Sequence, residues 1–491
     1  MKAVTEDIAS AHESFGTAAP MALPAARPGR KVLLIAFDFP PRRTSGVYRP
    51  IALTKYLPRF GWQPTVLTIS DSKALEDASL LAKVPTDVEV VRTPYLRING
   101  WEGSLHRLVR SLGALRAPAG GKVIPFSPPM TAAQGAAPNG NHPSRLDACL
   151  QMAAAAVRAG LYFPDESAGW IPFGLEAALE LAMREHFDAV YTTHPPRSAH
   201  VIGMALRALC KVPWVAEFRD PWIVPDHERP IFSEQVPAKR RNQWLHASLL
   251  QHADGIVTVT PYHAEELKTV FHAPADKLAV VANGFDEDDF DLQTPPAPLA
   301  MFEPGLVHLA QFGTVYGKFS GRFFPALAEL LREKPWLREA VRVHVVGFPD
   351  TDTRAYADGE LRDVIRVHGF IPHGEALNAM RASHALLLFY GHDYTSRAQV
   401  PGKLYEYLRI GRPLFAVAFP GGVRDLITRA QAGWVFGPED VAGMKQGLEQ
   451  LIEAARGGGA LPRPLPEVVA EYRYERLAGK VASVLERAAT K

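Results

Sequence analysis

The sequence predicts an α/β fold made of two doubly wound parallel-sheet domains that face each other across a cleft. Three observations support this prediction. The chain has 491 residues, too many for one hydrophobic core, since single cores stop growing at roughly 250–300 residues. Short continuous apolar runs, typical of strands buried on both faces, occur in two series along the chain. Stretches of helical period separate most of these runs, as the crossover connections of a parallel sheet require.

The first series of apolar runs predicts a first domain over residues 30–290. The helix that follows the first run carries Leu53, Leu57 and Phe60 on one face and is expected to end at Gly61. The seven runs are VLLIAF (32–37), TVLTI (65–69), VEVVRT (88–93), AVYTT (189–193), WVAEF (214–218), GIVTVT (255–260) and LAVVAN (278–283).

Two stretches in this half of the chain lack such patterning. Residues 1–29 are rich in Ala, Pro and Ser without periodicity, which predicts a disordered leader. Residues 117–145 are dense in Gly, Pro, Ala and Asn, which predicts a flexible insertion within the first domain.

The second series begins after an acidic, Pro-rich segment and predicts a second domain over residues 291–467. The last residues, 468–491, have no strand after them and predict a terminal helix that returns to the first domain, with an apolar stripe of Tyr472, Leu477, Val481 and Leu485. The six runs of the second series are LVHLAQFG (306–313), VRVHVVG (341–347), VIRVHGFI (364–371), ALLLFY (385–390), PLFAVA (413–418) and GWVFG (433–437).

Composition excludes several classes of protein. The formal net charge is +2, whereas nucleic-acid binders usually show a strongly basic domain. Cys149 and Cys210 are too few for a disulfide framework and have no zinc-site spacing, which favours a reducing compartment. The N-terminal residues include Asp and Glu where a signal peptide is apolar, and no run approaches the ~18 apolar residues of a membrane span. We therefore expect a cytoplasmic protein that binds no nucleic acid.

Loops that follow strands are the places to look for a site, because ligands of open parallel sheets bind at the carboxyl ends of the strands. The first such loop is FDFPPRRTSG, residues 37–46. Gly46 permits close approach of the backbone to a ligand, and Arg42 and Arg43 are suited to face phosphate. A solvated turn in which the glycine serves only the backbone remains the alternative.

The second loop, QFGTVYGKFSGRFF (311–324), combines a strand end at Gly313 with a helix expected to begin near Ser320. Backbone N–H groups and the helix dipole favour an anion there, and Lys318 and Arg322 add positive charge. The loop is one residue shorter than a P-loop, and Phe319 stands where Ser or Thr would hold magnesium, so an ATPase is excluded. No G-x-G-x-x-G occurs, which argues against a dehydrogenase.

The third segment, VPGKLYEYLRIGRP (400–413), is a predicted helix with Pro401 at its start and Gly411 at its end. Lys403 and Glu406 lie three residues apart on one face. Two interpretations stay open. The two side chains form an ion pair with each other, or the Glu406 carboxylate binds the two ribose hydroxyls of a nucleotide.

Taken together, these segments make residues 31–487 similar to the retaining glycosyltransferases of family 4, in particular the bacterial branch that builds surface polysaccharides. Many family-like segments in the family's order are more specific than any single loop. The segments that resemble the family are KVLLIAFDFPP, KYLPRFGWQPTVLT, FPDESAGW, VYTTHPPRSAH, PWVAEFRDPW, ADGIVTVT, NGFDEDDF, FGTVYGKF and VPGKLYEYLRIGRPL.

The resemblance implies a GT-B fold and a hexosyltransferase activity. It places the nucleotide-diphosphate sugar mainly on the second domain and a glycan or lipid-linked acceptor mainly on the first, and it requires no metal or other cofactor. Glu406 matches the second glutamate of the family's Glu-x7-Glu motif, and Ala398 stands in place of the first, which puts the contact to the transferred sugar in doubt. The implied donor-binding residues are Gly46, Gly313, Thr314, Lys318, Arg322, Lys403 and Glu406.

The resemblance also suggests catalytic residues. Where many members carry a histidine after a first-domain strand, this chain has Arg219 and Asp220. Asp220 is then suited to orient the acceptor or a neighbouring imidazole, with a turn before Pro221 as the alternative. His194 is a second candidate, with a hydrogen-bonded structural role as its alternative.

In the family, the donor's own phosphate is thought to accept the acceptor's proton during front-face attack. The protein then has to stabilise the leaving group, a role for which positive charge in the 311–324 loop is suited. The catalytic residues expected there are Lys318 and Arg322.

Two questions remain open from the sequence. The missing carboxylate and histidine leave a catalytically silent nucleotide-sugar-binding protein as one alternative, and a nucleotide-sugar epimerase of the same fold as another. Segment 101–116 is either an amphipathic helix packed on its own core or an interfacial helix at the cytoplasmic face of the inner membrane. Its apolar positions are Leu105, Leu108, Val109, Leu112 and Leu115, and its basic ones His106, Arg107, Arg110 and Arg116.

Overall fold

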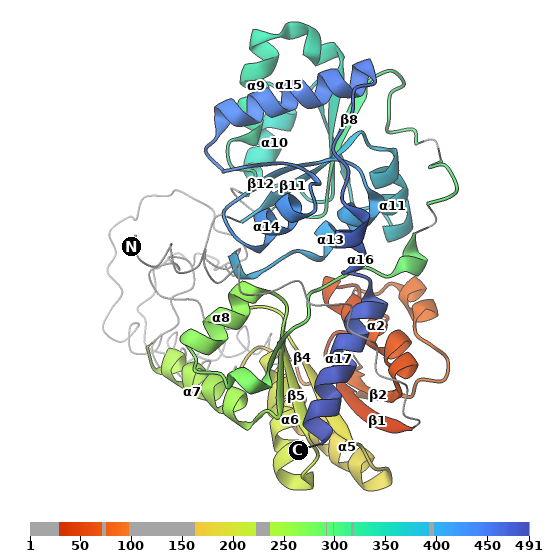
Figure 1. Cartoon of the computed structure of the whole chain (residues 1–491), viewed down its shortest axis with the longest axis vertical. Coiled ribbons are helices and arrows are strands. Elements are labelled where there is room, and N and C mark those ends of the chain that lie inside the picture. The colour runs from red at the N-terminus through yellow and green to blue at the C-terminus, as the bar shows by residue number, and fades with distance from the viewer. Residues whose placement is uncertain are drawn as a thin grey trace, which may run out of the picture.

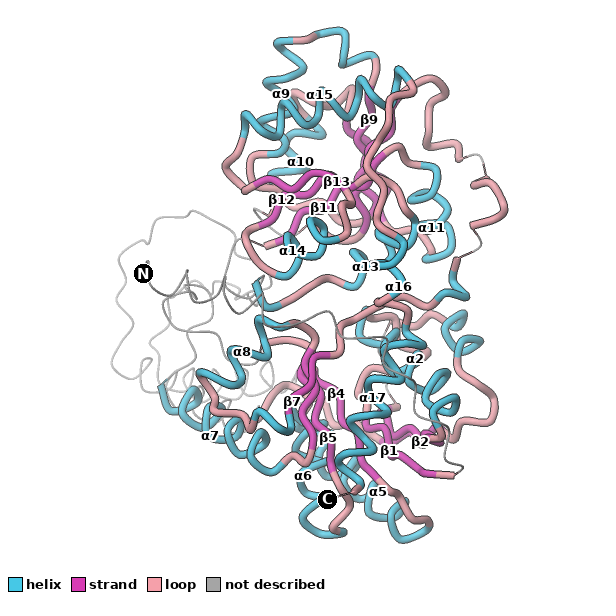
Figure 2. The backbone as a smooth tube through the Cα atoms, viewed as in Figure 1, coloured by secondary structure: helices cyan, strands magenta, loops and turns pink. Residues whose placement is uncertain are grey.

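A computed structural model describes residues 29–70, 75–97, 163–221, 236–290, 292–297, 299–315, 319–391 and 397–490, with the side chains of 236–239 excepted. Two α/β lobes lie one above the other along the long axis of the molecule (Figure 1). Each lobe has strands at its centre and helices around them (Figure 2). The predicted fold class is confirmed.

The first lobe contains a sheet of seven parallel strands in the order β3-β2-β1-β4-β5-β6-β7. All seven predicted runs are strands, and their ends differ from the prediction by a few residues. In the register, Leu33 of β1 lies opposite Thr65 of β2, and Val32 lies opposite Ala189 of β4. The strands are β1 (Arg30–Ile35), β2 (Trp62–Ile69), β3 (Val90–Thr93), β4 (Ala189–His194), β5 (Trp214–Phe218), β6 (Gly255–Thr258) and β7 (Leu278–Val280).

Helices cover both faces of this sheet, because alternate residues of its central strands are apolar on both sides. Leu33 and Ile35 pack into the cluster that includes α5 and α6, whereas Val32 and Leu34 pack into the cluster that includes α2 and α17. A 3-10 turn extends α2 to Gly61, whose φ of +81° closes it as predicted. The helices of this lobe are α2 (Tyr48–Tyr56), α5 (Ile171–Arg184), α6 (Arg197–Cys210), α7 (Val236–His252), α8 (Pro261–Thr269) and α17 (Tyr474–Ala489).

The second lobe contains a sheet of six parallel strands in the order β10-β9-β8-β11-β12-β13. All six runs predicted there are strands. They are β8 (Val307–Phe312), β9 (Val341–Val346), β10 (Ile365–Gly369), β11 (Ala385–Tyr390), β12 (Leu414–Ala418) and β13 (Gly433–Phe436).

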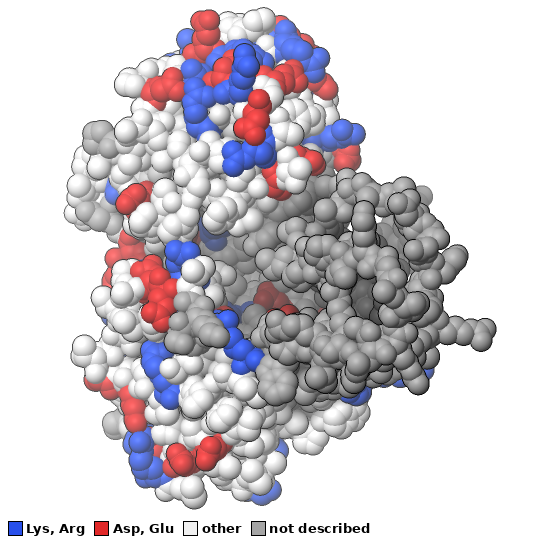
Figure 3. Space-filling model, turned by 180° about the vertical axis from the view of Figure 1, so that it is seen from behind, with Lys and Arg blue, Asp and Glu red and all other residues white. Residues whose placement is uncertain are grey.

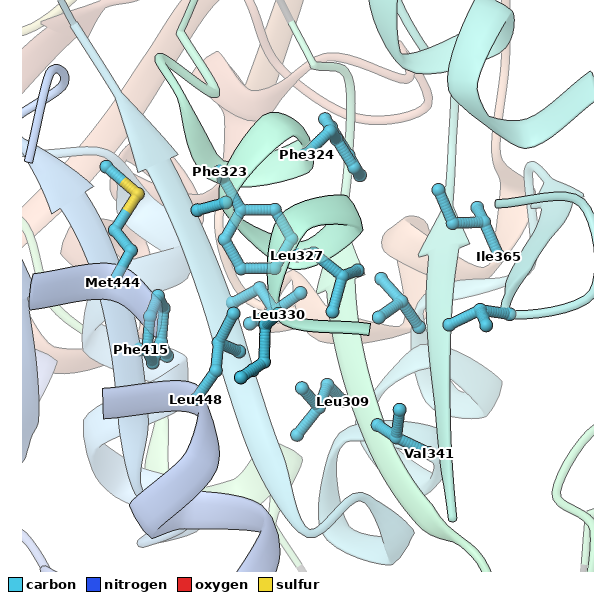
Figure 4. Packing of buried hydrophobic residues seen from close by; sticks show 14 of the residues in the cluster. Leu309, Phe323, Phe324, Leu327, Leu330, Val341, Ile365, Phe415, Met444 and Leu448 are labelled. Carbon is cyan, nitrogen blue, oxygen red and sulfur yellow. The ribbon is translucent and has the colours of Figure 1, made fainter. Parts of the chain in front are cut away.

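One face of the second sheet is covered by α9 and α15. Phe323 and Leu327 of α9 and Leu448 of α15 pack in one cluster with Leu309 and Phe415 of the strands (Figure 4), and all are fully buried. Burying a side chain of this size stabilises the fold by roughly 1.5–3 kcal/mol. The helices of this lobe are α9 (Phe323–Glu333), α10 (Thr351–Asp358), α11 (His373–Ala382), α13 (Gly402–Ile410), α14 (Gly422–Arg429), α15 (Val441–Gly457) and α16 (Pro466–Ala470).

Short 3-10 helices complete the described elements. Those that bear on the site are η1 (Ser45–Val47), η3 (Ala78–Lys83) and η7 (Glu287–Asp289), and the others are η2 (Leu57–Phe60), η4 (Ala168–Trp170), η6 (Ala275–Lys277) and η8 (Pro335–Glu339).

The chain passes between the lobes twice, and the two crossings lie side by side. The backbone N–H of Phe285 donates to the carbonyl of Tyr472, and that of Tyr474 donates to the carbonyl of Phe285. A Cβ on Gly284 would lie 2.1 Å from the Tyr472 oxygen, so only glycine allows this approach. The second crossing carries α17 back onto the first lobe, as predicted (Figure 1).

The predicted terminal helix over 468–491 is two helices, α16 and α17, because the crossing separates them. Tyr472 therefore lies in the crossing rather than on the apolar stripe of α17, and its ring contacts Tyr405 at a centroid distance of 4.9 Å.

Several expectations concern residues outside the described ranges: the leader up to residue 28, the insertion 117–145, segment 101–116, Cys149 and Lys318. Within the described ranges, no helix is both long enough and apolar enough to cross a bilayer.

Candidate active site

A cavity of about 650 Å³ lies between the carboxyl edges of the two sheets and is lined by both lobes. From behind, Figure 3 shows side chains of both charges at the waist between the lobes. The first lobe contributes Asp38, Thr44, Ser45, Gly46, Tyr48, Arg49, Ile51, Lys83, Pro195, Arg219, Asp220 and Tyr474. The crossing contributes Asn283, Gly284, Phe285, Asp286 and Asp289. The second lobe contributes Gly313, Thr314, His373, Tyr390, Gln399, Val400, Pro401, Gly402, Lys403 and Glu406.

Gly46 lies at the cavity, in the middle of η1. A Cβ there would lie 2.6 Å from Asp38 Oδ2, so the glycine permits a close approach of the two loop ends. Arg219 holds this loop, since its Nη1 donates to the Gly46 carbonyl (3.1 Å) and its Nε to the His194 carbonyl (2.9 Å).

The two arginines of the same loop do not line the cavity. Arg42 forms an ion pair with Asp38 at 3.1 Å. The Arg43 guanidinium lies 4.4 Å from the ring centroid of Phe370, in the other lobe. The structure therefore gives each arginine a partner within the protein and places neither at the cavity.

Asp220 lines the cavity and reaches across it. Its Oδ1 accepts a hydrogen bond of 2.7 Å from Gln399 Nε2 of the second lobe. Burial raises the pKa of the Asp220 carboxyl above its ordinary value, against the opposing effects of Arg219 and the Gln399 hydrogen bond. A carboxylate held at the junction of two lobes is suited to contact a substrate bound between them.

His194 lies behind the cavity rather than in it. Its ring is buried at the end of β4 and stacks on His200 at a centroid distance of 5.9 Å. Burial, with nearby His200 and arginines, holds the pKa of His194 well below its ordinary value, so the ring is neutral. The structure thus favours the structural alternative for His194.

Gly313 and Thr314 lie at the cavity, directly after β8. Gly313 has a φ of +86°. A Cβ on the neighbouring Gly347 would lie 2.4 Å from the Gly313 carbonyl oxygen. The left-handed conformation turns this loop tightly over the end of the sheet.

Arg322 is not brought to the cavity. Gly321 packs against Pro438, and the Arg322 N–H donates to the Pro438 carbonyl, so the chain turns outward before α9 begins at Phe323. The Arg322 side chain is more than half exposed and pairs with Glu439 at 3.2 Å. The structure therefore places Arg322 away from the cavity, and the helix begins three residues later than predicted.

Helix α13 brings Lys403 and Glu406 to the cavity, each with its own partner. Its Gly411 cap has a φ of +79°, as predicted for the helix end. Lys403 Nζ donates to the Phe312 carbonyl at 2.9 Å, and burial lowers the pKa of Lys403 to about 8. Glu406 Oε1 accepts from His373 Nε2 at 2.9 Å. The alternative in which Lys403 and Glu406 pair with each other is excluded.

Two family models match the chain in the order of its lobes. Residues 130–289 match Glycosyltransferase Family 4, and residues 314–454 match Glycosyl transferases group 1. The chain is a glycosyltransferase of the family 4 and group 1 type. No curated protein matches it in sequence.

Solved structures agree with the glycosyltransferase fold. Sucrose-phosphate synthase from Thermosynechococcus elongatus superposes with a TM-score of 0.55 at 14% identity, covering 93% of this chain and 98% of that one. Anabaena Alr3699/HepE in complex with UDP superposes with a TM-score of 0.53 at 14% identity, covering 93% and 100%. At such identities the likeness establishes the GT-B fold alone.

Sequence reasoning missed several cavity residues of this glycosyltransferase. The acidic run after Phe285, which the sequence marks only as a family-like segment between the domains, ties the crossing to the first lobe: Asp286 accepts from Lys55 Nζ at 2.7 Å and from Tyr56 OH at 2.6 Å, and Asp289 pairs with Lys83 at 2.5 Å. The density of acids in NGFDEDDF was the available signal. Nothing in the local sequence marks His373.

Beneath the cavity, the glycosyltransferase buries an ion pair. The Glu217 side chain is 0% exposed and accepts from Arg49 Nε at 2.5 Å, Tyr191 OH at 2.5 Å and Thr193 Oγ1 at 2.6 Å. Arg49 also donates to the carbonyls of Val281 and Ala282 at the crossing. This network fixes the floor of the cavity to the first crossing. Within the described ranges, no three His, Cys, Asp or Glu side chains are grouped as a metal site needs.

Proposed function

We propose that this glycosyltransferase moves a hexosyl group, with retention, from a nucleotide-diphosphate sugar to a glycan or lipid-linked acceptor in surface-polysaccharide synthesis. The observation that carries the proposal is α13, which presents Lys403 and Glu406 together at the cavity beside Gly313 and Thr314. Related folds support it: Anabaena Alr3699/HepE also forms a complex with UDP and glucose (TM-score 0.51), and WaaB, with a TM-score of 0.50, is a lipopolysaccharide outer core galactosyltransferase.

In this proposal Glu406 binds the ribose hydroxyls, and Lys403 faces the diphosphate. The bond from the acceptor oxygen to the anomeric carbon forms as the bond from that carbon to the phosphate oxygen breaks. The acceptor's proton passes to the phosphate of the departing nucleoside diphosphate. Asp220, held across the cavity by Gln399, orients the acceptor hydroxyl.

Glu406→Ala is expected to weaken binding of the nucleoside diphosphate at least tenfold. Two charge-assisted hydrogen bonds, at about 1.5–3 kcal/mol each, are lost with the carboxylate. Calorimetric titration with UDP, GDP and ADP measures the change, after a thermal-shift comparison of the three identifies the best ligand.

The matched control is Glu89→Ala, because Glu89 is half-exposed and pairs with Arg184 away from the cavity. Equal affinity of the wild type and Glu406→Ala for the best ligand would refute the ribose assignment. Turnover of the corresponding nucleotide sugars separates a transferase from a silent binding protein, and product analysis without acceptor identifies an epimerase.

Peripheral membrane contact through segment 101–116 remains a proposal from sequence. Arg107 and Arg110 lie on its basic side, where attraction to anionic lipid is worth about 1 kcal/mol per residue. We expect salt-sensitive co-sedimentation with anionic vesicles, reduced when both arginines are changed to Glu. Equal sedimentation of the two proteins would show that the segment packs on the core instead.

A further inference from the structure

His373 is the closest ionisable neighbour that the structure gives to Glu406, and it comes from a different helix. It is the first residue of α11, whereas Glu406 lies in the middle of α13. His373 Nε2 and Glu406 Oε1 are 2.9 Å apart, and both side chains line the cavity. Because an ionised carboxylate only accepts hydrogen bonds, Nε2 is the donor. One carboxylate oxygen is thereby held in place.

The other side of the imidazole is covered by the opposite lobe. The ring of Tyr48, at the start of α2, lies 5.4 Å from the His373 ring, centroid to centroid. Lys83 Nζ lies 5.7 Å from the Tyr48 ring centroid and forms an ion pair with Asp289 of the crossing. His373 is therefore enclosed by both lobes and by the crossing between them, so its orientation depends on their assembly.

The charges around His373 favour its protonated form. Burial opposes the charge, but the hydrogen bond and negative charge of Glu406 from α13, with Asp289 from η7, outweigh burial and the opposing Lys83 from η3. The net effect raises the pKa of His373 above its ordinary value. Asp77, just before η3, also interacts electrostatically with the imidazole. Tyr48, from α2, is uncharged, since burial and nearby acids raise the pKa of its hydroxyl.

We propose that His373 is a positioning residue for Glu406: its imidazolium aims the carboxylate at the ribose, so that affinity for the nucleotide depends on the proton that His373 carries. This inference rests on the proposed function. As pH rises through the pKa of His373, the imidazole becomes neutral and the charge-assisted hydrogen bond becomes an ordinary one, which is about half as strong. Nucleotide affinity then falls.

The test compares the wild type with His373→Gln and His373→Ala by calorimetric titration of UDP, GDP and ADP at pH 6 and pH 8.5. Glutamine keeps an N–H donor without a charge that titrates, and alanine removes the donor. Comparing proteins at the same pH cancels the ionisation of the nucleotide itself. His186→Gln is the control, because that ring is 85% exposed and lies outside the cavity.

From pH 6 to pH 8.5 we expect the nucleotide affinity of the wild type to fall about three- to tenfold more than the nucleotide affinity of His373→Gln falls. His373→Ala is expected to bind about tenfold more weakly than the wild type at pH 6, with KM for the nucleotide sugar raised and kcat at saturation unchanged. Thermal unfolding without nucleotide shows whether each variant is folded. A merely structural role would not give a pH dependence that the glutamine variant abolishes.

The outcomes separate this inference from the function on which it rests. If the wild type binds nucleotide and Glu406→Ala weakens binding, but the pH dependence of His373→Gln equals that of the wild type, the positioning role is overturned and the proposed function stands. The same holds if His373→Ala binds as tightly as the wild type. If the wild type binds none of the three nucleotides, both proposals are overturned.

Discussion

Glu217→Ala is expected to lower the free energy of unfolding by about 3–5 kcal/mol, because it leaves a buried guanidinium without its counter-charge. Arg49 is 3% exposed and lies against Glu217. The hydroxyls of Tyr191 and Thr193 lose the same acceptor, and an unsatisfied buried donor costs about 1–3 kcal/mol. The effect should appear in the first lobe, which contains all four side chains.

Urea unfolding followed by tryptophan fluorescence measures this change, since Trp62, Trp170 and Trp214 are buried in the first lobe. The double variant Arg49→Met with Glu217→Leu is the matched comparison, because replacing both charges by apolar groups removes the uncompensated charge. We expect it to be more stable than Glu217→Ala. If the free energy of unfolding of Glu217→Ala lies within about 1 kcal/mol of the wild-type value, water reaches the ion pair and the network is not a buried one.

Acidification from pH 7 to pH 5 is expected to lower the free energy of unfolding by several kcal/mol. The reason is that the folded protein keeps several buried histidines in their neutral form. In the second lobe, His344 stands in the middle of a row of three imidazoles joined by hydrogen bonds. Its Nε2 lies 2.9 Å from His308 Nδ1, and its Nδ1 lies 2.9 Å from His368 Nε2. Burial, with the neighbouring histidines and arginines, lowers the pKa of His344 to about 3. In the first lobe, burial likewise lowers the pKa of His200 to about 3.

The sign follows from proton binding. Below about pH 6.5 the unfolded chain takes up protons at these histidines, whereas the folded chain takes them up only near pH 3, so acid favours unfolding throughout that window. Each such group contributes about 1.4 kcal/mol per pH unit, or about 2 kcal/mol between pH 6.5 and pH 5. Paired carboxylates such as Asp254 have lowered pKa values, so their contribution to stability is lost only at a pH below this window.

Thermal unfolding between pH 7.5 and pH 5 measures this dependence. His344→Gln is expected to give a shallower slope than the wild type, whereas His186→Gln, at an exposed position, should leave the slope unchanged. A melting temperature that stays constant down to pH 5 would mean that the buried rings are protonated in the folded protein.

The strands could be predicted from the sequence because burial on both faces leaves a local pattern. VLLIAF and ALLLFY are continuous apolar runs, and in the structure both form central strands covered on each side by helices. The helix ends at Gly61 and Gly411 could also be predicted from local sequence, since the left-handed conformation at the end of a helix favours glycine.

Part of the candidate site could also be predicted, because ligands of parallel sheets lie at the carboxyl ends of strands. Gly46, Gly313, Thr314, Lys403, Glu406 and Asp220 all line the cavity. The direction of a side chain in a loop was less predictable. Arg322 points away because a turn packed on Pro438 directs it to Glu439, 117 residues further along the chain.

By itself, the sequence determined two parallel sheets, the order of their strands along the chain and the segments that meet at the cleft, since these depend on local periodicity and on the rules of parallel connection. The tertiary structure alone decided which partner each charged group takes. Lys403 contacts a carbonyl 91 residues away, Glu406 an imidazole 33 residues away, and Asp220 an amide 179 residues away. The energy of a buried charge depends on the few groups within hydrogen-bond distance, and only the packing of two lobes brings those groups together.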